Sequence, residues 1–525
     1  MAAIRGNLAP AVRSWLLSGV AVRGQQRLGI GAIVALCALP VVVHVFAFRD
    51  AIIDDAFIQL QYGHQLAASG TWGMLPDRLA NTSTSTLNVF LLALADLLPG
   101  SLRDVALLLA AAELLAMLAL LLRLSLRLFG SYGFGLAAFA AVVFNPLLLS
   151  TLGLETVPFF TLMLASVLLF LEGRHLLMST ALAFLTLTRP DGVLLAAILL
   201  PQAPGGQRWR CLALYVALLL PWHLYAWTQL GSPLPDTLFI KLTRDAWGGE
   251  HFFRNGLGLY LERFPLPTIA SFLLAPFALY ALRRAAPPLV RALATTLLLY
   301  AALHYVAYSL AGVPPFHWYY LHEAVPLAVA GAAGLSLLAR DRGLAALQPL
   351  AWGLPLLVFF VIAAGSGWPF HEAPIHTNWA TTRQYREVGR WLAENVPPGA
   401  PVLVRGEIGT LAYYSQRTLV NEFSDFNLAT RIMDDSASAG VLRPLLDVMS
   451  AWRPVLPPLQ CPAYVIEQTT GDDAGVLSEG FGARHGGTLL ADWPAATKWM
   501  PRAHVYVWRL PPDALAADAS LDCAP

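Results

Sequence analysis

The sequence is short of charge. Only 13% of its 525 residues are Asp, Glu, Lys or Arg, and 57% are hydrophobic, whereas soluble domains carry roughly 25% charged residues. Lysine is the scarcest base, present only as Lys241 and Lys498, so that almost every positive side chain is arginine. The net charge of +1 gives no support to a nucleic-acid partner. The composition excludes an ordinary soluble protein and indicates a membrane protein.

Common nucleotide and hydrolase motifs are also missing. The sequence contains no GxxxxGK[ST] phosphate loop, no HExxH and no GxSxG. Nucleotide hydrolysis, zinc proteolysis and serine hydrolysis are therefore poor interpretations. No repeat of about 20 to 50 residues is visible. What remains is transport, or chemistry on a membrane-borne donor.

Cysteine is nearly absent. Cys37 and Cys211 lie in apolar runs, and Cys461 and Cys523 lie in the polar C-terminal part. Only the last two could form a disulfide, and only if that part faces an oxidising compartment. We predict that they are bridged.

Long apolar runs recur from residue 28 to residue 364, which indicates a polytopic protein rather than a secretory signal. A helical crossing needs about 20 residues. The runs predict eleven spans, at 28–48, 104–122, 133–151, 155–171, 176–188, 191–204, 211–228, 267–282, 290–311, 321–339 and 349–364.

Arginine positions orient these spans, because cytoplasmic loops carry an excess of positive charge. The arginines within residues 1–27 place the N-terminus in the cytoplasm. The later arginines agree only if the short run 88–98 does not cross, so we expect an interfacial or re-entrant helix there. Eleven crossings then leave three regions on the outer face: the loops 49–103 and 229–266, and the segment 366–525.

The outer segment 366–525 is long enough for a small domain. In "TTRQYREVGRWLAEN", Tyr385, Val388 and Leu392 share one face of an amphipathic helix, and "PVLVR" and "RTLV" read as strands. The expected organisation is a cytoplasmic N-terminus (1–27), an all-α transmembrane part (28–365) and an extracytoplasmic C-terminal α/β domain (366–525).

An acidic pair, Asp54 and Asp55, directly follows the first span. Acids at this place can simply cap a helix and favour its dipole. Alternatively, one carboxylate is a general base, or a metal ligand, where a lipid-linked substrate presents its head group. A base must be ionised and within reach of the attacking hydroxyl.

The second long outer loop, "GSPLPDTLFIKLTRD", places Lys241 and Arg244 within one helical turn. Cations beside a membrane often anchor lipid head groups. The alternative is that both neutralise a substrate phosphate, and the rarity of lysine favours it.

Further ionisable groups lie at span ends, where charge is costly and often functional. Glu155 begins a span in "LGLETVPF", and Arg189 stands next but one to Asp191 in "LTRPDGVLL". Arg189 with Asp191 is interpreted first as a structural ion pair, and Glu155 and Arg189 are retained as candidate substrate ligands.

Two polar or aromatic clusters complete the candidates. "NTSTSTLN" brings Asn81 and Thr82, which could cap a helix or bind sugar hydroxyls. "FHWYYLHE" brings the residues His317, Tyr319, Tyr320 and His322, which could form an interfacial belt or a platform for a sugar ring.

Taken in order, these stretches resemble the GT-C superfamily, integral membrane glycosyltransferases that use polyprenyl-phosphate sugars. The likeness rests on "IDDAFIQLQYGHQLAASGTWG", "ANTSTSTLNVFLL", "GLETVPF", "TRPDGVLL", "GSPLPDTLFIKLTRDAWGG" and "WYYLHEAVPL". Within it, the chain is most similar to the terminal arabinofuranosyltransferases of mycobacterial arabinogalactan. The resemblance covers residues 28–365 and, loosely, the tail.

The resemblance implies an inverting single displacement, with arabinofuranose moving from a polyprenyl-phosphate donor to an outer glycan or protein acceptor. Asp54, the first acid of the pair, would be the general base, with Asp55 close behind. Lys241 and Arg244 would bind the donor phosphate. Family members often carry Arg-Tyr-Tyr where this chain has "WYY", so that arginine's phosphate contact is either lost or moved to His317 or His322. No metal is required, although paired acids keep a divalent cation possible.

Rival interpretations remain at this stage. A flippase or transporter of lipid-linked sugars would place ionisable groups at mid-span and show duplicated halves. A sensor or scaffold would tolerate the loss of both Asp54 and Asp55. Within the superfamily, transfer of a hexose such as mannose is the alternative to arabinofuranose.

Overall fold

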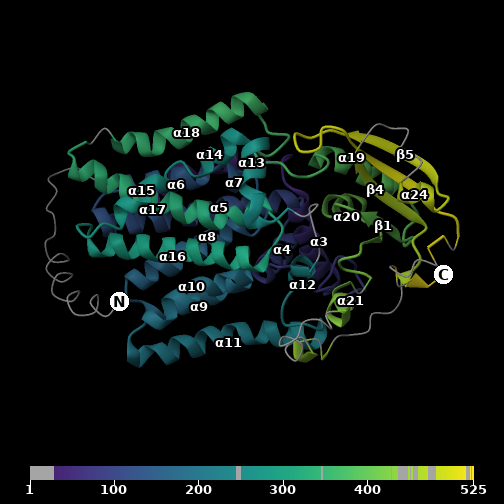
Figure 1. The fold of residues 1–525 in the computed structure, drawn as a ribbon, viewed down its shortest axis with the longest axis horizontal. Coiled ribbons are helices and arrows are strands. Elements are labelled where there is room, and N and C mark those ends of the chain that lie inside the picture. Colours follow the sequence, from purple (N-terminus) through teal and green to yellow (C-terminus); the bar gives the residue numbers. More distant parts are fainter. Residues whose placement is uncertain are drawn as a thin grey trace.

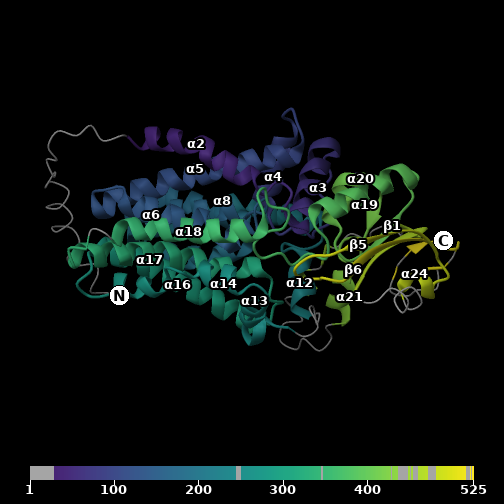
Figure 2. The same cartoon turned by 90° about the horizontal axis from the view of Figure 1, so that it is seen from above.

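The computed structural model describes residues 29–243, 250–344, 347–426, 428–435, 447–449, 451–452, 459–470, 480–512, 514–515, 521 and 523–524. Two parts lie end to end along the long axis of the molecule (Figure 1). One part is a bundle of helices, and the other is a C-terminal sheet domain. Three helices, α3 (Asp54–Ser69), α4 (Thr86–Asp96) and α12 (Asp236–Thr243), lie where the two parts meet (Figures 1 and 2).

The bundle is built from helices of very different lengths. They are α2 (Ile30–Phe46), α5 (Leu102–Phe129), α6 (Gly133–Val143), α7 (Pro146–Leu149), α8 (Thr156–Leu171), α9 (His175–Thr188), α10 (Val193–Leu199), α11 (Gly205–Gln229), α13 (Leu257–Arg263), α14 (Pro265–Ser271), α15 (Ala275–Ala281), α16 (Pro288–Ala311), α17 (Leu321–Asp341) and α18 (Leu347–Ser366). Short 3-10 turns, η2 (Pro190–Gly192) and η6 (His317–Tyr320), precede α10 and α17.

Among the described residues, five helices are long and apolar enough to cross a membrane, or six if one bent pair is a single span. The five are α5, α11, α16, α17 with its preceding turn, and α18. The bent pair joins Phe252–Arg263 to Pro265–Ala281 at 120°. The protein is therefore multi-pass, but the predicted count of eleven spans is not confirmed.

Helix length explains the difference. The predicted spans 133–151, 155–171, 176–188 and 191–204 fall on helices shorter than 18 residues. A 16-residue helix such as α8 is about 24 Å long, less than the hydrocarbon core of about 30 Å. The run 88–98, which we expected not to cross, forms the 11-residue helix α4.

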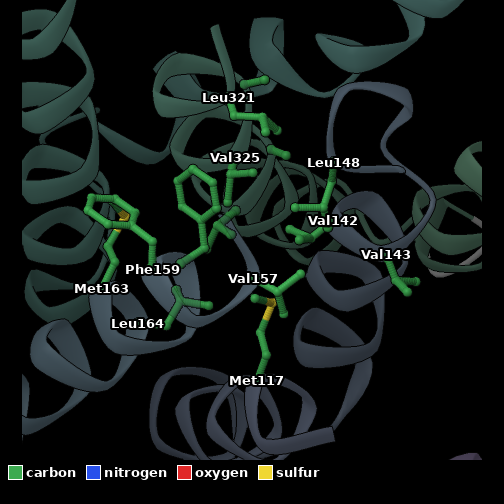
Figure 3. Close-up of a cluster of buried hydrophobic side chains, with 14 of the residues drawn as sticks. Met117, Val142, Val143, Leu148, Val157, Phe159, Met163, Leu164, Leu321 and Val325 are labelled. Carbon is green, nitrogen blue, oxygen red and sulfur yellow. The ribbon is translucent and has the colours of Figure 1, made fainter. Parts of the chain in front are cut away.

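The core of the bundle is a cluster of apolar side chains that face one another from α5, α6, α8 and α17 (Figure 3). Met117, Val157, Phe159 and Val325 are at most 1% exposed. Helix α17 lies against α15 with its backbone in close contact. A Cβ at Gly331 would overlap the carbonyl oxygen of Leu274, and small residues allow such close approach.

The sheet domain carries one mixed sheet with the strand order β2-β1-β4-β6-β5. Its strands are β1 (Val402–Arg405), β2 (Leu419–Val420), β4 (Tyr464–Thr470), β5 (Thr488–Ala495) and β6 (Ala503–Arg509). β2, β1 and β4 are parallel, whereas β6 and β5 are antiparallel. The expected strands "PVLVR" and "RTLV" are β1 and β2.

Three helices and a single helical turn complete the sheet domain. α19 (Thr382–Asn395) is the expected amphipathic helix, and it buries Tyr385, Val388 and Leu392. α20 (Gly409–Ser415) lies between the sheet and α3, and α24 (Phe481–Arg484) is a single turn (Figure 1). α21 (Leu428–Asp435) follows β2.

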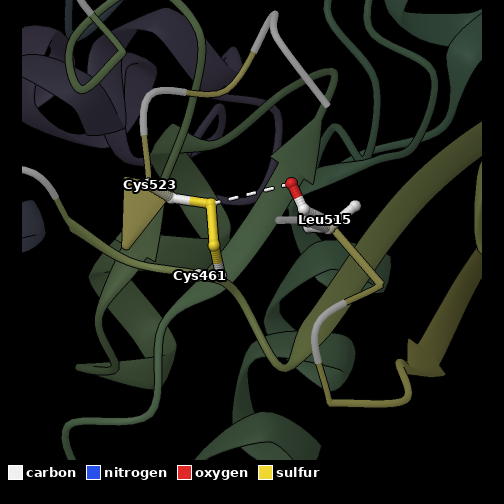
Figure 4. The surroundings of a disulfide bond; sticks show 3 residues. All are labelled: Cys461, Leu515 and Cys523. Carbon is white, nitrogen blue, oxygen red and sulfur yellow. Dashed lines mark hydrogen bonds between the residues drawn. A yellow bond between two sulfur atoms is a disulfide. The ribbon is translucent and has the colours of Figure 1, made fainter. Parts of the chain in front are cut away.

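The predicted pairing of cysteines is confirmed, since Cys461 and Cys523 form a disulfide (Figure 4). The bond joins the short parallel strands β3 (Leu459–Gln460) and β7 (Cys523–Ala524). Cys37 and Cys211 are free.

Candidate active site

A cavity of about 650 Å³ lies where the bundle meets the sheet domain. Its helical wall comes from α3, α12, α13, η6, the loop before α4 and the turn after α9. Its sheet wall comes from the loops that follow β1 and β2. Of the predicted site residues, those that line it are Asp54, Asp55, Thr82, Glu155, Arg189, Lys241 and Tyr319.

Asp54 is the first residue of α3 and is 4% exposed. Its carboxylate accepts hydrogen bonds from the backbone N–H groups of Gly409 (2.8 Å) and Thr410 (2.7 Å), the first residues of α20. Burial raises the pKa of Asp54, and these two bonds oppose the rise. Asp54 therefore caps a helix of the sheet domain and ties that domain to α3.

Asp55 differs from its neighbour. It lines the same cavity, and no other described residue donates a hydrogen bond to its carboxylate. Burial raises its pKa to about 6, and the charge of Lys241 opposes the rise. The carboxylate is thus ionised at neutral pH, yet it is a stronger base than an ordinary aspartate.

Lys241, on α12, lines the same cavity as Asp55. Its Nζ lies 3.4 Å from the hydroxyl of Tyr319 and 4.9 Å from the ring centre of Phe316. It forms no ion pair with any described carboxylate. Its charge is therefore available to a phosphate. Arg244, the predicted second cation, lies outside the described residues.

Arg189 is already neutralised. Its Nη1 donates to Glu155 (2.6 Å) and its Nε to Asp191 (3.1 Å), and Tyr308 donates to Asp191 as well (2.8 Å). The expected pair Arg189–Asp191 is present, and Glu155 joins it. Glu155 also accepts from the side-chain amide of Gln59. This network fixes the floor of the cavity and leaves Arg189, which is paired with two carboxylates, with no unpaired positive charge to offer a phosphate.

Asn81 lies outside the cavity and fixes the loop that carries α12. Its side-chain amide donates to the carbonyl oxygens of Ser232 (3.0 Å) and Leu234 (2.8 Å). Its backbone carbonyl accepts from the backbone N–H of Asp236 (2.7 Å). Thr82 lines the cavity and bonds the hydroxyl of Tyr62 (2.7 Å).

Three predicted residues of η6 and α17 turn away from the cavity. His317 contacts the carbonyl of Ser150 (3.4 Å), Tyr320 donates to the carbonyl of Phe252 (2.8 Å), and His322 contacts the hydroxyl of Tyr300 (2.6 Å). All three are buried. Successive side chains of a 3-10 turn point about 120° apart, so Trp318 and Tyr319 reach the cavity while their neighbours do not.

Among the residues that the structure describes, one group could be considered for a metal ion. Asp191, His304 and His322 each offer a ligand atom, all within 4.8 Å of one another. Both Nε2 atoms lie 3.7 Å from the Asp191 carboxylate. The imidazole rings, however, are stacked at 4.2 Å with 5° between their planes. A metal ion lies in the plane of each ring that binds it, and parallel rings share no plane, so this arrangement does not fit an ion held by both.

Glu407, on the sheet wall, was not predicted. It follows β1 directly, lines the cavity, and accepts from the Asn378 side-chain amide (2.6 Å) and the Tyr385 hydroxyl (2.5 Å). Burial and the nearby charge of Asp54 hold its pKa well above the usual range. Asn378 also accepts from the backbone N–H of Asp54 (3.1 Å). The available signal was a polar residue at the carboxyl end of a buried strand.

Arg263 was also missed. It lines the cavity, its guanidinium lies 5.6 Å from the ring centre of Trp499, and it forms no ion pair with a described carboxylate. It therefore provides a second cation without an acidic partner, beside Lys241.

Comparisons with known proteins address the fold. Residues 376–507 match a family model described as "Domain of unknown function (DUF8728)". No curated protein matches the chain. The structure is similar to ArnT from Cupriavidus metallidurans bound to undecaprenyl phosphate, with a TM-score of 0.56 and 14% identity over 94% of this chain and 98% of that one.

It is also similar to the arabinofuranosyltransferase AftD from Mycobacteria, with a TM-score of 0.52 and 16% identity. That match covers 92% of this chain but only 40% of AftD. The fold is thus that of the GT-C glycosyltransferases, which confirms the resemblance predicted from the ordered motifs.

Proposed function

We propose that the chain is a membrane glycosyltransferase that moves a sugar from a polyprenyl-phosphate donor to an acceptor hydroxyl in the cavity described above. The carrying observation is that one cavity holds an unbonded carboxylate, Asp55, together with a lysine that has no ion pair. The undecaprenyl phosphate bound to ArnT supports a polyprenyl donor.

In this proposal Asp55 is the general base. The acceptor oxygen attacks the anomeric carbon as the bond to the donor phosphate breaks, and Asp55 takes the hydroxyl proton. A phosphate leaving group needs its charge stabilised more than it needs a proton. Lys241 and Arg263 supply that charge, with Arg244 as a further proposed contact. One displacement at one carbon inverts its configuration.

Asp55 replaces Asp54 as the preferred base because of what each carboxylate contacts. Asp54 uses both oxygens on the backbone of α20, so accepting a proton there would break a bond that holds the sheet domain. Asp55 has no such contact to lose. Asp54 is thus proposed as a positioning residue beside the base.

The finer parts of the function have separate support. Disulfides persist outside the reducing cytoplasm. The Cys461–Cys523 disulfide therefore favours a sheet domain and an active site on the extracytoplasmic side of the plasma membrane. Arabinofuranose as the sugar rests on the likeness to AftD and on the ordered motifs. The acceptor is a glycan or a glycosylated protein on the same side.

The test is transfer by the purified protein in lipid nanodiscs, supplied with undecaprenyl-phosphate arabinofuranose or undecaprenyl-phosphate mannose and an octyl glycoside acceptor. We expect new glycoside and released undecaprenyl phosphate with the arabinofuranose donor. Turnover of the mannose donor alone would make mannose the transferred sugar in place of arabinofuranose and would leave the proposed reaction unchanged. No turnover of either donor, with both shown to bind, would contradict the proposal.

A further inference from the structure

A second cavity, of about 700 Å³, lies in the sheet domain next to the first. Trp379, Gly406, Asn421 and Phe423 line both. We name this second cavity the outer groove. Its other lining residues are Val404, Arg405, Glu422, Glu467, Gln468, Thr469, Gly480, Phe481 and Arg484. A ligand whose end lies in the first cavity would therefore extend into this groove.

The outer groove lies at the carboxyl ends of the three parallel strands. β1 ends at Arg405, β2 is followed by Asn421, and the second half of β4 supplies Glu467. Parallel strands bring such ends together at one edge of the sheet, and ligands of α/β folds bind in the crevice there. The same edge supplies Glu407 to the first cavity.

Glu467 shows that the groove has an unmet binding capacity. The residue is 4% exposed, and its Oε2 accepts from the backbone N–H of Phe481 (2.7 Å). Its Oε1 is buried and has no hydrogen-bond partner. An unpaired buried carboxylate oxygen is costly, and a hydroxyl donor from a ligand would satisfy it.

The remaining side chains suit a sugar. The amide of Gln468 is held by the backbone of Glu407 (3.1 and 3.2 Å), and the amide oxygen of Asn421 accepts from the N–H of Ser424 (2.9 Å), which leaves the amide NH₂ group of Asn421 as a donor. The rings of Trp379 and Phe423 offer apolar faces on which the C–H face of a sugar packs. The guanidinium of Arg405 lies 4.2 Å from the ring centre of Phe481, which holds it along the groove.

An extended peptide fits less well. Peptides that add to a sheet pair with an edge strand, and the edges of this sheet are β2 and β5. The groove instead runs across the ends of β1 and β4, where no strand can pair.

We propose that the outer groove binds the glycan chain of the acceptor, with Glu467 accepting a hydrogen bond from a sugar hydroxyl beyond the residue that receives the transferred sugar. This inference rests on the proposed function and gives residues 376–507 a role in acceptor binding.

The experiment compares a disaccharide with a hexasaccharide, both octyl oligoarabinofuranosides, as acceptors for the full chain in nanodiscs. In the unmodified protein we expect a lower KM for the hexasaccharide. Glu467→Gln keeps an oxygen for the N–H of Phe481 and removes the charge, so we expect the hexasaccharide KM to rise roughly tenfold, the loss of one hydrogen bond to a charged group. The disaccharide KM and kcat stay unchanged.

The matched control is Glu387→Gln, at an exposed glutamate on α19 outside both cavities. This variant should leave the KM of both acceptors unchanged. Equal KM values for the two acceptors in the unmodified protein would overturn the proposal that the groove binds the acceptor glycan. A Glu467→Gln variant that raises both KM values equally would overturn it as well. Failure of donor turnover with every acceptor would instead overturn the proposed function, so the two failures are distinguishable.

Discussion

The two walls of the cavity differ in kind. The helical wall carries most of the charge: Asp55 and Lys241, which form no ion pair with a described residue, and Arg189, which is paired with Glu155 and Asp191. The sheet wall carries amides, aromatic rings and one buried acid, Glu407, whose carboxylate is held by three neighbouring groups. In the proposed reaction, the chemistry belongs to the helical wall and the contacts with the acceptor belong to the sheet wall.

The strongest test of this division is Asp55→Asn. Because the base would be lost while both walls keep their shape, we expect transfer to fall by about 10³-fold, within the usual range for a general base. Release of undecaprenyl phosphate measures it, and the melting temperature should stay the same. The control is Asp77→Asn, at an exposed aspartate between α3 and α4. Full turnover by Asp55→Asn would remove the base from the helical wall.

Lys241→Ala tests the other charge of that wall. We expect donor affinity to fall about tenfold or more, since a charge-assisted contact to phosphate is lost, while acceptor KM changes little. Titration with a short-chain polyprenyl-phosphate sugar measures it. The chain provides its own control in Lys498→Ala, at its only other lysine, which is exposed. Equal donor affinity in the two variants would contradict the phosphate role.

The pH profile should report Asp55. Its pKa lies near 6 because of burial, and only the ionised form accepts a proton. We therefore expect kcat/KM to fall about tenfold for each pH unit below about 6, with a plateau above. A flat profile between pH 5 and 7, with the folded fraction constant by fluorescence, would be at odds with an aspartate base.

The smallest expected effect is that of Asp54→Ala, which separates the two neighbouring acids. Two N–H groups of α20 would lose their acceptor, and loss of a helix cap costs about 1 to 2 kcal/mol. We expect a lower melting temperature and faster proteolysis between α18 and α19, with turnover reduced less than in Asp55→Asn. An unchanged melting temperature together with abolished turnover would return the base to Asp54.

The helical wall could be predicted from the sequence because an ionisable residue stands out in an apolar background. Asp55, Glu155, Arg189 and Lys241 were identified in this way, and they meet in one cavity. The sheet wall could not be predicted in this way, because Glu407 or Glu467 is one polar residue among many in a domain of ordinary composition. Both are recognised as site residues only in the folded sheet, where the parallel strands bring them to the two cavities.

Other differences have equally physical origins. The roles of Asp54 and Asp55 could not be separated by spacing, because adjacent helical residues point about 100° apart and only the position of α20 decides which carboxylate is capped. The same ambiguity affected η6, where Tyr319 reaches the cavity and His317 does not. Apolar length predicted the helices of the bundle, but the predicted number of spans is not confirmed, because several of the runs fold as helices shorter than 18 residues.

Gly409 carries a consequence for protein engineering. A Cβ at this position would overlap the backbone of Asp54 and Ile58, so only glycine lets α20 approach α3 closely enough for its N–H groups to reach the carboxylate. A chimera that grafts a foreign outer domain onto this bundle therefore needs a glycine at the graft's first helical residue. Without it, the grafted domain would stand off from α3, and the hybrid would fold as two correct halves with the sheet wall displaced from Asp55.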